Sequence, residues 1–167
     1  MEVTLAHNHL TILNLLAHYA ELLDARDYQA VGALFRHGRI TGAGSEKETV
    51  GPEAVAELFA SFGAGQGSGG PVHHMTTNVH IDFADDGLRA RSRAYFLVVG
   101  WEVAPVVRFF GRYEDEFAVI DGERCFTRRH MIPEFPASWP PGLSPPRHGT
   151  EDCDRPAHWW WSSGSPR

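Results

Sequence analysis

The sequence has few cysteines, no long apolar run and no excess of basic residues, and each shortage excludes a class of protein. Two cysteines, Cys125 and Cys153, are too few for a disulfide framework and fit a reducing cytoplasm. No apolar stretch approaches the roughly 20 residues that cross a bilayer, and no signal peptide is visible. The 15 basic residues against 21 acidic ones give a net charge of -6, which argues against nucleic acid as a partner. We therefore expect a cytoplasmic protein with neither a membrane nor a nucleic acid as its partner.

Motifs for metals and phosphates are also missing. The ten histidines form no His-Glu-X-X-His pattern and the cysteines form no Cys-X-X-Cys pair, so the sequence predicts no metal site. The glycine-rich stretch 63–70 has no following Lys-Ser or Lys-Thr and leads into a strand-like run, which excludes a phosphate-binding loop. We interpret this stretch as a loop that could act as a lid. We expect no cofactor, and the many histidines direct the search toward acid–base chemistry.

The apolar pattern predicts three helices in the first part of the chain. Leucine and isoleucine recur at helical spacing over 9–23, on more than one face, which indicates a well-buried helix. A short helix follows, with Asp27 as its N-cap. The residues 39–41 favour a short strand and 42–48 a polar turn. A third helix opens at Pro52. Its buried stripe consists of Val55, Leu58, Phe59 and Phe62.

Beyond residue 70 the period changes to that of strands. The four predicted strands are His73–Phe83, Leu88–Val99, Val106–Ile120 and Arg124–Pro133. The pair Asp121-Gly122 between the last two is a strong hairpin signal. Helices followed by an antiparallel meander indicate an α+β fold, with the helices packed on one face of a curved sheet.

The composition changes again at residue 135. We expect residues 1–134 to form the folded domain, because 135–167 are rich in proline, which excludes regular structure. This C-terminal tail contains Trp139 and the run Trp159–Trp161, whereas disordered tails are poor in aromatic residues. We therefore expect the tail to dock, either as a lid or as a contact between subunits.

Two residues stand out as a potential acid–base pair. Asp24 ends the first helix, where a negative charge opposes the helix dipole and therefore needs a partner. His74 opens the first long strand. Taken singly, each has a simpler interpretation, which is a cap or a solvated acid for Asp24 and a hydrogen-bonded rim histidine for His74.

The pattern leaves open which histidine of the first strand faces the helices. Successive strand residues point to opposite sides, so only one of His73 and His74 can do so. Val79, Ile81 and Phe83 share the odd-numbered face with His73, unless a bulge shifts the alternation.

Tyr19 and Arg129 are further candidates. Tyr19 lies among leucines of the first helix, where most tyrosines pack and place the hydroxyl on a partner. Arg129 lies on the less polar face of the last strand and could hold an anion. Its alternative role is an ion pair across the sheet with Asp115 or Glu116.

Together these motifs resemble the SnoaL-like family, within the superfamily that shares the nuclear-transport-factor cone fold. The resemblance covers about residues 8–134 and rests on Tyr19-Ala-Glu-Leu-Leu-Asp24, His74-Met-Thr-Thr-Asn78, Gly111-Arg-Tyr113 and Phe126-Thr-Arg-Arg129. It implies a cone-shaped α+β barrel with three N-terminal helices on a curved, mostly antiparallel sheet. The chain is most similar to the branch of scytalone dehydratase, bile-acid dehydratase and dehydrochlorinase, in which an Asp ending the first helix pairs with a His on the first long strand.

The resemblance implies roles for the candidate residues. Asp24 and His74 become a catalytic dyad, with Tyr19 as proton donor to a leaving hydroxyl and Arg129 as holder of negative charge. The predicted substrate-binding residues are Asn78, Phe59, Tyr95, Phe110, Tyr113 and Met131. We thus expect a cofactor-independent lyase of dehydratase type that acts on a small apolar or polycyclic molecule.

Other functions share this fold, so the fold does not decide the activity. An isomerase or a polyketide-type cyclase could use the same pocket, because each begins by abstracting a proton. A non-catalytic ligand-binding module needs no acid–base pair. The resemblance also implies a homo-oligomer, a dimer or a trimer, formed through the open face of the sheet. There, Arg89, Arg91 and Arg93 share one side of the second long strand with Tyr95 and Leu97.

Overall fold

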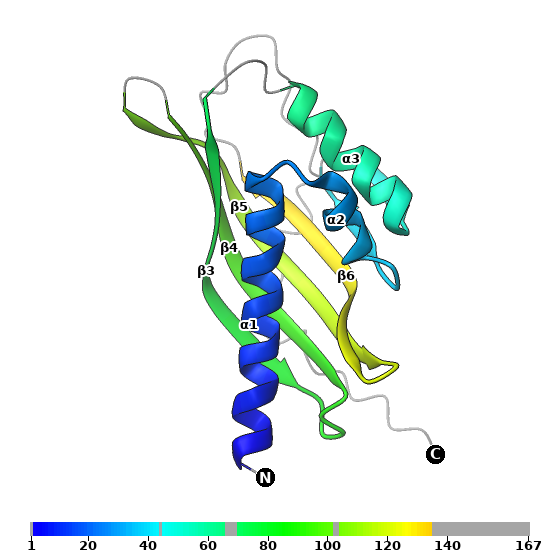
Figure 1. Cartoon of the computed structure of the whole chain (residues 1–167). Helices are drawn as coiled ribbons and strands as arrows, with labels where there is room; N and C mark the ends of the chain where they lie inside the picture. Colours follow the sequence, from blue (N-terminus) through cyan, green and yellow to red (C-terminus); the bar gives the residue numbers. More distant parts are fainter. Residues whose placement is uncertain (1, 44, 66–69, 102–103, 135–167) are drawn as a thin grey trace.

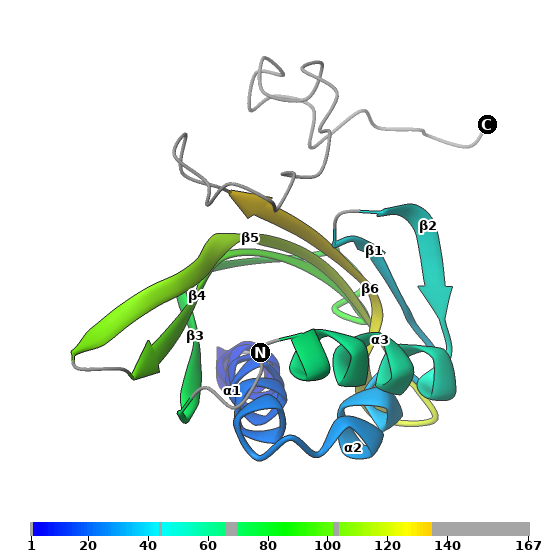
Figure 2. The ribbon, with the colours of Figure 1, turned by 90° about the horizontal axis from the view of Figure 1, so that it is seen from above.

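Three helices lie on the concave face of a curved six-stranded sheet (Figures 1 and 2). The computed structural model describes residues 2–43, 45–65, 70–101 and 104–134. The helices are α1 (Glu2–Asp24), α2 (Tyr28–Ala33) and α3 (Pro52–Gly65), and the strands are β1 (Arg39–Gly42), β2 (Ser45–Val50), β3 (Val72–Phe83), β4 (Arg89–Trp101), β5 (Pro105–Ile120) and β6 (Glu123–Glu134). The strand order is β2-β1-β6-β5-β4-β3, antiparallel except for β1 beside β6. The predicted fold class is therefore confirmed.

Helix α1 presents two different faces. Ile12, Leu16, Tyr19 and Leu23 recur every three or four residues and are buried against the sheet. Leu13 and Ala17 lie on another side of the helix and are exposed. This second side runs toward Asp24 and faces the neighbourhood of β3.

The prediction for 42–48 was wrong, because the polar segment forms strand β2 after a turn. Gly42 and Ala43 adopt the left-handed conformation, with φ of 77° and 51°, and reverse the chain. Strand β2 is an edge strand whose only apolar residue is Val50. Edge strands tolerate polar side chains because few of them meet a core, so the apolar alternation that signals a strand is missing.

The first helix is also longer than predicted and begins at Glu2 rather than near residue 9. In these extra turns the described residues Ala6 and His7 are exposed, which is consistent with the weak apolar signal there. Helix α3 takes up the first residues of the predicted glycine loop and ends at Gly65. The remainder of that loop, 66–69, and the tail 135–167 lie outside the described residues.

A bulge in β3 decides which histidine faces the helices. The register with β4 shifts between Thr77 and His80, and Asn78 between them has a φ of 53°. Before the bulge, His74 pairs with the buried Val98 and Thr76 with the buried Phe96. After the bulge the odd-numbered residues pair with the buried positions of β4, namely Ile81 with Ser92 and Phe83 with Ala90. His74 therefore lies on the helix-facing side together with the apolar residues that follow the bulge.

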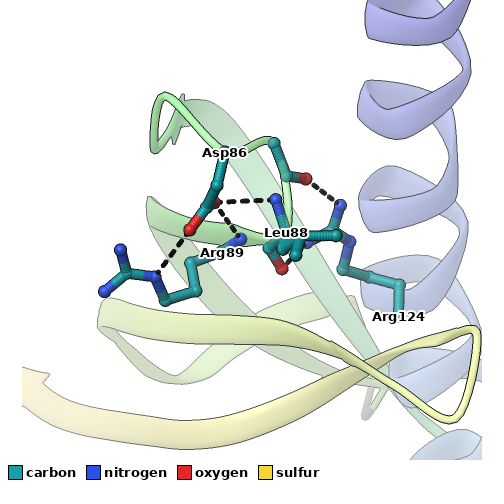
Figure 3. Close-up of polar contacts among 5 residues, drawn as sticks. Asp86, Leu88, Arg89 and Arg124 are labelled. Atoms are coloured by element: carbon teal, nitrogen blue, oxygen red, sulfur yellow. Dashed lines mark hydrogen bonds and ion pairs between the residues drawn. The ribbon is translucent and has the colours of Figure 1, made fainter.

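Arg124, at the start of β6, fastens the turn between β3 and β4 (Figure 3). Its guanidinium donates to the carbonyls of Gly87 and Leu88 at 2.9 Å and 2.6 Å. Within the turn, the Asp86 carboxylate accepts from the backbone N–H groups of Leu88 and Arg89 at 2.8 Å and 3.2 Å. These contacts join the start of β6 to the β3–β4 turn, at the end of the sheet opposite the start of β3.

The core is built around a fully buried ion pair between Arg129 of β6 and Asp115 of β5. Two hydrogen bonds of 2.8 Å join the guanidinium to both carboxylate oxygens. The guanidinium carbon lies 4.1 Å from the ring centroids of Tyr19 and of Tyr113. Burial lowers the pKa of Arg129, but the pairing with Asp115 outweighs it, so the pKa lies above its usual range. The arginine is thus a charged element of the core.

We expect replacement of Asp115 by Ala to cost about 3–5 kcal/mol of unfolding free energy, because it leaves the Arg129 charge buried without a partner. Urea denaturation measures this cost. The exposed pair Arg112–Glu134 on the same two strands is the matched control, and its loss should cost less than about 1 kcal/mol. If D115A does not fold, the double variant D115L/R129M removes both charges and should restore folding. Equal costs for the buried and exposed pairs would contradict the assignment.

Candidate active site

Asp24 joins the end of α1 to the start of β3 through three hydrogen bonds. Its Oδ1 accepts from the backbone N–H of His74 and from the Nδ1 of the same residue, both at 2.8 Å. Its Oδ2 accepts from Nδ1 of His73 at 3.0 Å. The helix stops there because Arg26 turns left-handed, with a φ of 57°. These partners offset the unfavourable position of an acid at a helix C-terminus.

The site is partly shielded from solvent. The side chain of His74 is 17% exposed and that of Asp24 is 26% exposed, whereas His73 is 68% exposed. Burial raises the pKa of Asp24, but the hydrogen bonds from His74 and His73 outweigh this effect and lower the pKa below its usual range. Asp24 is therefore an ionised acceptor at neutral pH.

The hydrogen bond from Nδ1 to Asp24 fixes the tautomer of His74. An ionised carboxylate only accepts, so Nδ1 carries the proton. In the neutral ring Nε2 is then the nitrogen with the free lone pair, which can accept a proton. Within the described residues Nε2 has no hydrogen-bond partner, which leaves it available to a bound molecule.

A groove of about 400 Å³ lies beside this dyad, between α1 and β3. Asp24 and His74 form one part of its wall. The rest is mostly apolar and comes from Leu13, Leu16, Ala17, Ala20, Met75 and Val79, with Thr76 and the exposed Glu21 as polar members. The volume lies in the range of small-molecule sites, and the lining favours an apolar ligand.

Two other predicted catalytic residues, Tyr19 and Arg129, lie in the core and do not line the groove. Arg129 forms the cross-strand pair with Asp115 that was one of its two interpretations. The hydroxyl of Tyr19 is buried without a hydrogen-bond partner in the described structure. Burial raises the pKa of Tyr19, and the nearby Arg129 offsets part of that rise. The roles that the resemblance implied for both residues stay predictions.

The predicted substrate-binding residues are dispersed over the domain. Phe59 and Tyr113 are buried core residues, and Met131 packs against the same core. Asn78 is the exposed residue of the β3 bulge. Two further members, Tyr95 and Phe110, are exposed on the outer face of the sheet, which points away from the helices. None of the six lines the groove beside the dyad.

The participation of His73 was not predicted. Strand alternation places His73 on the opposite side from His74, but the carboxylate lies at the strand end and reaches both rings. The dipeptide His73-His74 is the sequence signal for a contact with both rings, but strand alternation predicts that only one of them faces the helices. For the groove, the sequence did carry a signal, because Leu13, Ala17 and Ala20 lie on the side of α1 that ends at Asp24.

Among the described residues, no group of His, Cys, Asp and Glu has the arrangement of a metal site. In the same part of the chain, no helix combines the length and apolar character needed to span a membrane.

Comparison with known proteins identifies the family. The model of the SnoaL-like domain matches residues 5–130, which is most of the chain. The chain belongs to the SnoaL-like family. No curated protein matches this SnoaL-like protein significantly.

Solved structures support the fold of this SnoaL-like protein. A putative scytalone dehydratase from Novosphingobium aromaticivorans is 22% identical, with a TM-score of 0.66 over 81% of this chain and 89% of that one. ActVI-ORFA from Streptomyces coelicolor is 20% identical, with a TM-score of 0.66 over 75% and 96%. A Catenulispora acidiphila structure in complex with S-DNPA is 19% identical, with a TM-score of 0.63 over 75% and 94%. At these identities the similarity establishes the fold alone.

The lowered pKa of Asp24 predicts a pH-dependent contribution to stability. A carboxylate whose folded pKa lies below its unfolded value, about 3.9, stabilises the protein above that value and loses this effect as pH falls through the folded pKa. The wild type should therefore unfold with a larger free energy than D24N near pH 7, and the difference should shrink below about pH 4. Urea denaturation across this pH range measures it. A difference that is independent of pH would contradict the ionised acceptor.

The geometry also predicts the tautomer of His74. Long-range proton–nitrogen NMR correlations should show the proton of the neutral ring on Nδ1 in the wild type. In D24N this preference should be lost, because the amide can either donate or accept. The matched control is D82N, which alters the pair between His80 and Asp82 on the same strand and should leave His74 unchanged. A proton on Nε2 in the wild type would rule out the proposed orientation.

Proposed function

We propose that this SnoaL-like protein is a cofactor-independent lyase of dehydratase type, with His74 as its general base. The observation that carries the proposal is the 2.8 Å bond from Nδ1 of His74 to Asp24, beside an apolar groove. A binding module needs a cavity but no oriented imidazole. A positioned base contributes roughly 10²–10⁴-fold to such a reaction.

The proposed reaction uses both protonation states of His74. The neutral Nε2 takes a proton from a carbon next to an electron-withdrawing group, and Asp24 stabilises the imidazolium that forms. The electron pair left on carbon forms the double bond as the hydroxyl on the adjacent carbon departs. The imidazolium returns its proton to that hydroxyl, so water leaves and His74 is neutral again. This scheme does not use the predicted roles of Tyr19 as proton donor and Arg129 as anion holder, because neither residue lines the groove.

The groove favours a small apolar or polycyclic substrate. Its walls offer aliphatic side chains, and its volume of about 400 Å³ fits a molecule of a few fused rings. The carboxylate of Glu21 at the groove disfavours an anionic substrate. The names of the structural neighbours, which include a putative scytalone dehydratase, agree with this class of compound.

We expect substitution of Asp24 by Asn or of His74 by Asn to lower turnover of β-hydroxy carbonyl substrates by about 10²–10⁴-fold. The assay is a panel of uncharged bicyclic and tricyclic compounds, followed by ultraviolet absorbance of the conjugated product. H80N is the matched control, because His80 lies on the same strand outside the groove and should retain wild-type turnover. Survival of turnover in both dyad variants would falsify the mechanism.

Solvent deuterium separates the lyase from its alternatives. A lyase releases water, whereas an isomerase or cyclase exchanges or moves the same carbon-bound proton without losing a hydroxyl. Incubation of a bound compound in deuterated water, followed by mass spectrometry, reports proton abstraction even where no bond to oxygen breaks. Binding without exchange or turnover across the panel would favour a non-catalytic module.

A further inference from the structure

The outer face of the sheet carries an exposed apolar patch. We call its members the outer patch, which consists of Met75, Tyr95, Leu97, Trp101, Val107 and Phe110. Met75 belongs to the edge strand β3 and also lines the groove. Five of them are strongly exposed, at 47% for Met75, 48% for Tyr95, 57% for Trp101, 51% for Val107 and 36% for Phe110. Leu97 pairs with Met75 of β3 on one side and with Phe110 of β5 on the other, so these three residues lie side by side across the sheet. Contiguous apolar surfaces of this kind mark contact sites.

The patch is bounded by charge on the same face. Farther along β4, the outward side chains are those of Arg89, Arg91 and Arg93, and Arg91 lies 3.8 Å from Glu116 of β5. The exposed apolar residues therefore gather in the half of the outer face near the start of β3 and the end of β6, with the Arg112–Glu134 pair beside them.

The described chain ends against this patch. Glu134, the last described residue, pairs with Phe110 of the patch in the β5–β6 register. Its carboxylate accepts a hydrogen bond of 2.9 Å from Nε of Arg112, which lies two residues along β5 from Phe110 and on the same face. The chain that follows therefore starts at the edge of the apolar surface.

The tail 135–167 has the composition that such a surface requires. It contains Trp139 and Trp159–Trp161, which are four of the five tryptophans of the protein. Aromatic side chains contribute the most apolar area per residue to contacts. The distance is also suitable, because strands are spaced by about 4.8 Å, whereas an extended chain covers about 3.3 Å per residue. Since the tail is tethered beside the patch, its effective concentration there exceeds that of a free partner.

We infer that the tail 135–167 packs its tryptophans on the outer patch of its own chain. Tyr95 and Phe110 then contact the tail, on the opposite side of the sheet from the groove. A second copy of the chain is the competing occupant of this face, since the sequence predicts a homo-oligomer formed there. The two differ in whether the contact lies within one chain or between chains.

A spin label on Cys153 tests the inference in the full-length protein. The other cysteine, Cys125, is buried and is replaced by Ala so that the label occupies one position. Methyl groups of Leu97 and Val107 should lose signal through paramagnetic relaxation when label and isotope are on the same chain. In a mixture of labelled, isotope-free chains with unlabelled, isotope-enriched chains, these signals should persist. The distant Leu88 at the β3–β4 turn is the internal control and should keep its signal in both samples.

Every outcome of this experiment decides the proposal. Signal loss in the mixed sample would assign the patch to a contact between chains and overturn the inference. Loss at Leu13 and Val79 in place of the patch would put the tail over the groove, and loss at neither site would leave the tail undocked. Substitution of Trp159–Trp161 by Ser should abolish the effect at the patch, whereas S162A/S163A should preserve it. The result is independent of turnover, so it stands or falls separately from the proposed lyase activity.

Discussion

The buried pair between Arg129 and Asp115 is the interaction on which the arrangement of the domain depends. A guanidinium with no exposed surface is stable only beside a matching carboxylate, and here the rings of Tyr19 and Tyr113 add cation–π contacts. Because α1 supplies one of these rings and β5 the other, the ion pair fixes the helix relative to the sheet. It also fills the space between α1, β5 and β6 with packed side chains. The groove lies on the other side of α1, next to β3.

Helix α1 consequently packs against the core with one side and lines the groove with another. One side is buried through Leu16 and Tyr19, and the other presents Ala17 and Ala20 to the groove. The small alanines leave room beside the helix, and Asp24 follows on the same side. Its carboxylate joins the helix end to β3, so the contact that closes this part of the fold also orients the imidazole. A substitution at Asp24 is therefore expected to change both the stability of the fold and the orientation of His74. The effect on stability can be measured on its own, because unfolding experiments need no substrate.

The sequence predicted the order of helices and strands well, since apolar residues at helical or alternating spacing report burial directly. It failed at β2, where an edge strand buries little and has no such pattern. It predicted the pairing of Asp24 with His74, but not the contact with His73, because alternation describes a regular strand and not its first residues. The bulge at Asn78 depends on the register between β3 and β4, which a single strand does not encode. The depth of Arg129 is likewise a product of packing among α1, β5 and β6, and the sequence left its two interpretations open.

The position of the dyad at an edge strand has a consequence for access. In the middle of a sheet, a side chain that faces the helices is covered by them and by the core. Strand β3 is the last of the sheet, and among the described elements it is α1 that packs on its inner side, with the groove between the two. In the proposed reaction, a substrate in this groove would contact His74 without displacing the packed rings around Arg129. The bulge at Asn78 completes this arrangement. It allows the polar residues His74 and Thr76, near the start of β3, to share a face with the apolar residues Ile81 and Phe83, near its end. A strand without the bulge would place either the histidine or the apolar residues on the outer face.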